Sequence, residues 1–307
     1  MMNIIGAPVA RTGLSFLCGV AALSSAALAQ VASNGTNTTD VQDAGTGNRW
    51  TAQNATAGNE RNVITIVQAA ISGFSDVTIS QLGMDNKASV TNKGVQNKAT
   101  AIQGNGRLSS TFNQISIVQE EGAFDSTVSI AQFEGSQAAP NVAKLTQDAS
   151  GSLIDVSARG FGNSTDVQQH GRGHSAQLSV SGGGVSSSGA SQGNSIVLKQ
   201  NGSTQTALFS VGNTVALWGK RNFAEVAQGG SNHLVRVWQR GNSDGVAIDQ
   251  SDSANPNSKA DPHRAIADVS QFASGSTVAV KQVGYANAMV SQGAGYASSV
   301  AINQTEP

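Results

Sequence analysis

Side-chain amides are the residues whose type and spacing point to chemistry in this chain, and that chemistry is hydrogen bonding. Twelve seven-residue windows begin with Asn or Ser at position 1, carry small or apolar residues at positions 3 and 5, and end with an amide at position 7. An amide donates and accepts hydrogen bonds, so amides placed one above another can bond along a stack. The windows are Asn62–Gln68, Ser75–Gln81, Asn86–Asn92, Asn97–Gln103, Asn113–Gln119, Ser126–Gln132, Asn141–Gln147, Asn163–Gln169, Asn194–Gln200, Asn222–Gln228, Ser276–Gln282 and Ser298–Gln304.

These amides, together with others at the same spacing, form a candidate assembly ladder. A buried polar group without a partner costs about 1–3 kcal/mol, and stacking supplies that partner from the neighbouring layer. The terminal members Asn62, Gln68, Gln292 and Gln304 are expected to meet amides of another molecule, since the last window ends three residues before Pro307. The ladder consists of Asn62, Gln68, Gln81, Asn86, Asn92, Asn97, Gln103, Gln119, Gln132, Asn141, Gln147, Asn163, Gln169, Asn194, Gln200, Asn222, Gln228, Gln239, Gln250, Gln271, Gln282, Gln292 and Gln304.

The elements that would position these amides are short β-strands. Alternate residues of a strand point to opposite faces, so positions 1, 3, 5 and 7 share one face. Every charged residue of the twelve windows stands at position 2, 4 or 6; in Asn222–Gln228, for example, Glu225 is opposite to Val226. The pattern predicts that one face is buried and ends in a polar amide on each side.

The spacing of the strands predicts an all-β fold, an amyloid-like β-solenoid. Amides recur every 11 residues at Gln81, Asn92 and Gln103, which fits a strand of about six residues and a turn of about five. Two such units make a coil of about 22 residues, and the mature chain would hold about 12 coils. Aromatic residues are only 5% of the chain, so we expect a thin core. Around Asn232–Gln239 the pattern slips by one residue, which predicts a bulge or a longer loop.

Five segments follow from this pattern. Residues 1–29 are typical of a secretory signal peptide, with a small-x-small cleavage site at Ala27-Leu28-Ala29. They hold the only cysteine, so the exported, extracellular chain would have no thiol. Residues 30–60 show no clean alternation and indicate a flexible leader. Strand repeats are expected over 61–250 and 264–304, separated by a Pro-containing insertion at 251–263.

The repeats resemble the curlin repeat of bacterial curli subunits over residues 61–250 and 264–304. The shared order is Gln-x-Gly-x-x-Asn-x-Ala-x-x-x-Gln. It is present here, with Asn in the first amide place, as Asn92-Lys-Gly94-Val-Gln-Asn97-Lys-Ala99-Thr-Ala-Ile-Gln103. The resemblance implies export through an outer-membrane secretion channel and polymerisation, alone or with other curli-type subunits, into extracellular amyloid fibres of biofilms. It also implies that the leader is a secretion-targeting segment. The chain departs from the family pattern in being long, irregular and interrupted.

Other groups of residues give weaker indications of a function. His170 and His174 have a metal-like spacing, but Gly171 and Gly173 favour a loop and no acidic partner follows, so no metal or cofactor is expected. Adjacent Glu120 and Glu121 are typical of a solvated turn, and the sequence shows no catalytic motif, so we expect no enzyme. A net charge of −1 gives no basic footprint for nucleic acid.

A patch of aromatic and basic side chains is a candidate adhesive site for surfaces or matrix components. The simpler interpretation is that these residues are aromatics at the sheet edge and charges that keep the chain soluble. The rival to a fibre subunit is a monomeric β-solenoid adhesin or surface-binding module that does not polymerise. The residues of the patch are Trp218, Trp238, Lys220, Arg221, Arg236 and Arg240.

Overall fold

The structure is a computed structural model, and its described part is built from two parallel sheets. It describes residues 29–32, 37–55, 61–69, 71–104, 110–135, 139–182, 193–212, 221–252, 265–272, 274–293, 295 and 297–305. Within these residues every regular element is a strand, which confirms the predicted all-β class. The predicted signal peptide lies almost entirely outside the described residues, as does most of the Pro-containing insertion. Among the described residues, none forms a helix suited to crossing a membrane.

Along the chain, successive strands belong alternately to the two sheets, with the short β8 as the one exception among the described strands. The twelve-stranded sheet contains, in spatial order, β1 (Ala29–Ala32), β3 (Arg49–Ala55), β5 (Asp76–Met84), β7 (Lys98–Gln103), β10 (Thr127–Phe133), β12 (Leu153–Gly160), β14 (Ser175–Gly182), β16 (Thr206–Gly212), β18 (Leu234–Gln239), β20 (Ile266–Gln271) and β22 (Asn287–Gln292), with β8 (Ser110–Thr111) pairing to β5. The eleven-stranded sheet contains β2 (Thr38–Asp43), β4 (Val63–Gln68), β6 (Lys87–Asn92), β9 (Gln114–Gln119), β11 (Val142–Ser150), β13 (Ser164–Arg172), β15 (Ser195–Ser203), β17 (Phe223–Ser231), β19 (Gly245–Ser251), β21 (Thr277–Val283) and β23 (Ser299–Thr305).

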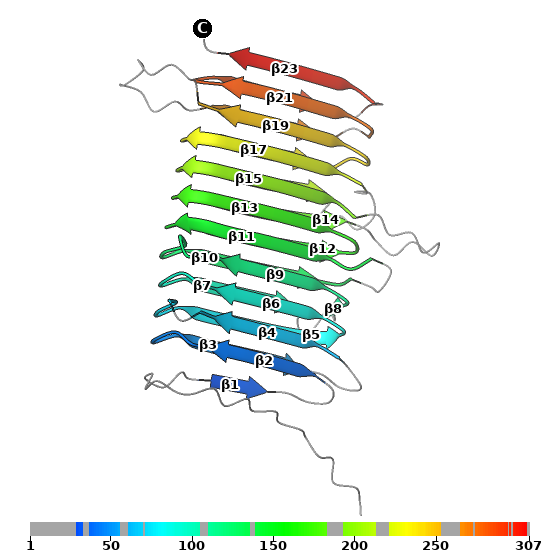
Figure 1. Ribbon diagram of the computed structural model, residues 1–307. Coiled ribbons are helices and arrows are strands. Elements are labelled where there is room, and N and C mark those ends of the chain that lie inside the picture. The colour runs from blue at the N-terminus through cyan, green and yellow to red at the C-terminus, as the bar shows by residue number, and fades with distance from the viewer. Residues whose placement is uncertain are drawn as a thin grey trace, which may run out of the picture.

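The chain passes alternately from one sheet to the other and rises through a single stack, from β1 at one end to β23 at the other (Figure 1). One strand of each sheet makes a layer. Equivalent residues of successive layers are separated by as few as 21 positions, from Gln271 to Gln292, and as many as 32, from Gln239 to Gln271. Because the strand pairing stays in register, the variation in length is taken up by the connections.

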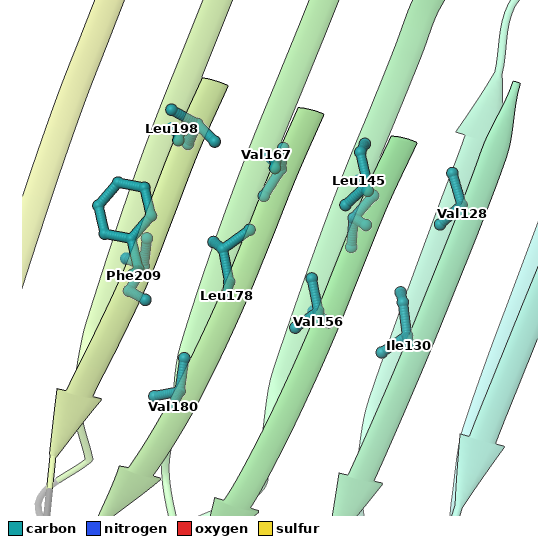
Figure 2. Packing of buried hydrophobic residues seen from close by; sticks show 14 of the residues in the cluster. Val128, Ile130, Leu145, Val156, Val167, Leu178, Val180, Leu198 and Phe209 are labelled. Carbon is teal, nitrogen blue, oxygen red and sulfur yellow. The ribbon is translucent and has the colours of Figure 1, made fainter. Parts of the chain in front are cut away.

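The core lies between the two sheets and is one side chain deep on each. In β17 the odd window positions Ala224, Val226 and Gln228 are buried, whereas Glu225 is exposed, as the alternation predicts. The buried apolar residues of both sheets form one continuous cluster, which Figure 2 shows in its central part around Leu145 and Leu178. A narrow core suits a chain rich in Val, Ile and Ala and poor in aromatics.

The expectation of a flexible leader does not hold for residues 37–55. Thr38–Asp43 forms β2 and Arg49–Ala55 forms β3, and both strands pair in register with the strands that follow. The residues of β3 fit the window pattern from Asn48 to Asn54. Position 3 is the bulky Trp50 rather than a small residue, so the pattern is hard to recognise in the sequence. The stack therefore begins well before Asn62.

A left-handed residue precedes position 1 in most layers and turns the chain into the next strand. Phe74, Gln96 and Asp125 are three of these, with φ of 53°, 57° and 50°. Their backbone N–H groups bond to the carbonyl oxygens of Thr46, Gly73 and Val95, one layer below. The turns are therefore hydrogen-bonded along the stack as the strands are.

Candidate functional site: the stacked amides

The longest column of amides runs along the eleven-stranded sheet at position 7. From Gln119 onward, each Nε2 donates to the Oε1 of the next glutamine at 2.8–3.1 Å. Most of these Nε2 groups also bond across the core, as from Gln147 to the carbonyl oxygen of Ser152 at 3.2 Å. The hydrogen bonds of the column therefore connect successive layers and also connect the two sheets across the core. Its members are Gln119, Gln147, Gln169, Gln200, Gln228, Gln250, Gln282 and Gln304.

The equivalent column of the twelve-stranded sheet is interrupted. Gln81, Gln103 and Gln132 are bonded in series at 2.7 and 3.3 Å, and Gln239, Gln271 and Gln292 form a second series at 2.9 and 2.8 Å. Between the two series the register positions are held by Ala158, Val180 and Val211, which carry no amide.

The interruption explains two buried polar atoms that have no hydrogen-bond partner. The Nε2 of Gln132 would donate to an amide on β12, but Ala158 occupies that place. The Oε1 of Gln239 would accept from an amide on β16, but its neighbour in register is Val211. The first series therefore ends in a donor without a partner, on Gln132, and the second begins with an acceptor without a partner, on Gln239.

A second kind of column forms at position 1, between side chains and backbone. In the eleven-stranded sheet the Asn62 side-chain oxygen accepts from the backbone N–H of Asn86 at 2.9 Å, and Asn86 does the same for Asn113 at 3.1 Å. The chain of such bonds is continuous from Asn37 to Ser298. In the twelve-stranded sheet a similar series includes Asn97, whose oxygen accepts from Ser126.

The structure places the predicted ladder residues in these four columns, along the two rims of the core. All are buried apart from Gln304, which is partly exposed on β23. Asn62 and Gln68 were expected at an end of the stack, but β4 lies between β2 and β6, so both are interior residues. That expectation was wrong because β2 and β3 had not been recognised.

Two histidines, His174 and His233, take the place of asparagine at position 1, a role that the sequence did not predict. The Nδ1 of His174 accepts from the backbone N–H of Gln205 at 3.4 Å, and its Nε2 donates to the His170 carbonyl oxygen at 2.9 Å. His233 repeats this arrangement with Ala265 and Gly229. Each imidazole therefore offers one acceptor and one donor, as an asparagine does.

The histidine at position 1 also corrects the predicted slip around Asn232–Gln239. Once His233 is read as the start of a window, Val235, Val237 and Gln239 follow at positions 3, 5 and 7, and all of them are buried. The strand stays in register with β16 and β20, without a bulge. The signal that could have revealed it is hydrogen-bonding capacity at position 1 rather than residue type.

Burial changes the acid–base chemistry of two position-1 residues. Burial lowers the pKa of His174, because the charged imidazolium loses solvation, and the nearby His170 acts in the same direction, while the backbone hydrogen bond to His170 opposes it. Burial raises the pKa of Asp244, against the opposing hydrogen bond from the Ser276 backbone. Both shifts favour the neutral form, as expected for groups buried away from solvent.

The structure separates the residues of the other candidate groups or pairs them with different partners. His170 turns to Asp148, with its Nδ1 2.9 Å from the carboxylate, while His174 is buried in the stack. Glu120 pairs with Lys93 at 2.8 Å. Throughout the described ranges, no group of His, Cys, Asp or Glu is arranged to hold a metal ion. Of the surface patch, Trp218 and Lys220 lie outside the described residues.

The chemistry that this arrangement offers is hydrogen bonding along the stack. The columns are built from donor and acceptor groups that repeat at the strand spacing, about 4.8 Å. Comparison with protein families, with curated proteins and with solved structures found no match.

Proposed function

We propose that the chain is a secreted structural subunit that assembles itself into extracellular, curli-like amyloid fibres for adhesion and biofilm matrix. In this proposal the stacked layers are coils of a β-solenoid, and fibre growth continues the stack from one molecule to the next. The observation that carries the proposal is the series of directional amide bonds from Gln119 to Gln304. Such a series gains a bond with each layer added.

The ends of the stack support growth by addition. Among the described strands, β1, β2, β22 and β23 each pair on one edge only. Some inward-facing apolar side chains near the ends are only partly buried: Val41 on β2 and Trp50 on β3 at one end, Val300 and Ile302 on β23 at the other. Unpaired strand edges with apolar side chains beside them are templates for a further strand. A second copy, placed head to tail, would cover both.

Localisation and partners follow from this role and from the resemblance to curlin repeats. The subunit would leave the cell through an outer-membrane secretion channel, after cleavage of the signal peptide, and join copies of itself or other curli-type subunits. The proposal includes no catalysis and no cofactor.

Assembly of purified mature protein tests the proposal. Incubation at micromolar concentration with thioflavin T, followed by electron microscopy, should show fibres after a lag that preformed seeds shorten. A monomer that stays soluble for days, with or without seeds, would support the alternative hypothesis of a monomeric adhesin and overturn the fibre proposal.

Paired substitutions locate the growing surface. Gln292→Ala with Gln304→Ala removes amides at one end, whereas Gln147→Ala with Gln169→Ala removes the same number from the interior. Losing about 1–2 kcal/mol at an intermolecular step slows addition roughly tenfold, so the end pair should lengthen the lag more than the interior pair does. An interior pair that is equally disruptive would show that growth does not pass through these ends.

A further inference from the structure

The outward face of the twelve-stranded sheet carries a hollow that fibre assembly does not use. Its volume is about 690 Å³, and side chains of β12, β14, β16, β18 and β20 line it. It lies on the side of the stack rather than at the ends, so it would stay accessible in a monomer and in a fibre. One of its lining residues, Trp238, is 45% exposed, which is unusual for so large an aromatic side chain.

The indole of Trp238 is supported from one side. The guanidinium of Arg240 lies 4.9 Å from the centre of the Trp238 ring and 5.9 Å from that of Phe272. These cation–π contacts hold the ring against its own strand and the next. A rigid aromatic surface binds a flat ligand with little loss of side-chain freedom. Trp238 is therefore a preorganised platform at the edge of the hollow.

Small polar side chains keep the space beside the platform open. Ser157 and Ser179 are in register with one another on β12 and β14, and Ser270 is in register with Trp238 on β20. All three line the hollow. Because neighbouring strands are about 4.8 Å apart, Ser157 and Ser179 place two hydroxyl groups about that far apart at one end of the hollow. Ser270 supplies a third hydroxyl beside Trp238, at the other end.

A second row of side chains, two residues earlier in each strand, supplies planar hydrogen-bonding groups. Asp155 and Gln177 are in register on β12 and β14, and Arg236 and Asp268 are in register on β18 and β20, with a closest approach of 3.8 Å. The two carboxylates offset the guanidinium of Arg236, so the hollow is not a basic surface. Its charge fits a neutral ligand better than a polyanion such as nucleic acid.

We propose that this hollow binds a neutral polysaccharide laid across the strands. A hexose ring has an apolar face of C–H groups, which can stack on the Trp238 indole, and a rim of hydroxyls, which can bond to the carboxylates, the amide and the guanidinium. One hexose unit is close in length to the strand spacing, so successive sugars would meet successive strands. This site does not depend on the fibre proposal, because it needs only one folded chain.

Binding to a soluble neutral glucan tests the site. Affinity electrophoresis of the monomer in gels containing hydroxyethylcellulose should show retardation, and Trp238→Ala should weaken the apparent affinity at least tenfold. Phe223→Ala is the matched control, since Phe223 is an exposed aromatic on the outward face of the other sheet. It should leave binding unchanged. Circular dichroism of both variants verifies the fold.

Further outcomes separate this ligand from others. Asp155→Asn keeps the shape of the hollow and should also weaken retardation, by a smaller factor. The proposal is overturned if hydroxyethylcellulose does not retard the native protein, if only polyglucuronate or duplex DNA does, or if the two aromatic substitutions have equal effects. Fibre formation by thioflavin T can succeed or fail independently of all these results.

Discussion

Replacing a single glutamine in the continuous column should destabilise the fold far more than replacing its neighbour. Gln169 is 2% exposed, whereas the adjacent Gln168 points outward and is exposed. Substitution by leucine keeps the approximate volume and removes the amide in both cases. The pair Gln169→Leu and Gln168→Leu therefore isolates the hydrogen bonds from strand propensity and chain position.

The magnitude follows from the bonds that are lost. The Oε1 of Gln169 accepts from Gln147 at 3.1 Å, and its Nε2 donates to the Oε1 of Gln200 at 2.8 Å and to the carbonyl oxygen of Leu153 at 3.2 Å. Gln147 keeps its bond to Ser152, but the Gln200 oxygen is left buried without this donor. At about 1–3 kcal/mol for a buried group left without a partner, Gln169→Leu should cost about 1–3 kcal/mol.

Guanidinium titration of freshly prepared monomer, followed by circular dichroism, measures the change. Gln168→Leu should stay within about 0.5 kcal/mol of the native protein, as surface substitutions usually do. Equal midpoints for the two variants, at unchanged m values, would refute the argument that the amide column stabilises the stack.

Two more predictions concern the position-1 column and the turns. Because burial lowers the pKa of His174, the folded chain holds its neutral form and the unfolded chain binds the proton first, so unfolding free energy should fall as the pH drops below about 6.5. His174→Asn should weaken this acid sensitivity in denaturant titrations at several pH values; an unchanged pH dependence would contradict the assignment. Gly202 has φ of +123°, and a Cβ there would overlap the carbonyl oxygen of Gly230, whereas Gly151, with φ of +57°, faces open space. Gly151→Ala should cost about 1–2 kcal/mol from its backbone alone, and Gly202→Ala clearly more by the same titration; equal costs would show that the close stacking of glycines is unimportant.

The strands were predictable from the sequence because the burial of one face controls residue choice at every second position. Glu225 and Val226 illustrate the rule, since a one-residue slip would bury the charge. The amide positions were predictable for the same reason. Windows that satisfy the hydrogen bonds with another residue type were missed: His174 and His233 act as asparagine does, and Trp50 replaces a small residue in β3.

The gaps in the ladder could not be predicted, because they depend on register between layers. Gln132 lies beside Ala158 because equivalent positions of these two strands are 26 residues apart in the chain. Ser126 and Ser152 have the same separation. That separation includes the connections between the sheets. The length of such connections ranges widely, and residue types in the turns do not determine it. Hydrogen-bond partners across layers therefore had to come from the structure.

X-ray diffraction from aligned fibres of the mature protein tests the central claim most directly, since it reports how the strands lie relative to the direction of growth. If the stack continues from one molecule to the next, strands run across the fibre axis, with a meridional reflection near about 4.8 Å and an equatorial one near about 10 Å. Fibres whose 4.8 Å reflection lies on the equator, or a protein that forms no fibres to align, would contradict growth through the stacked amides.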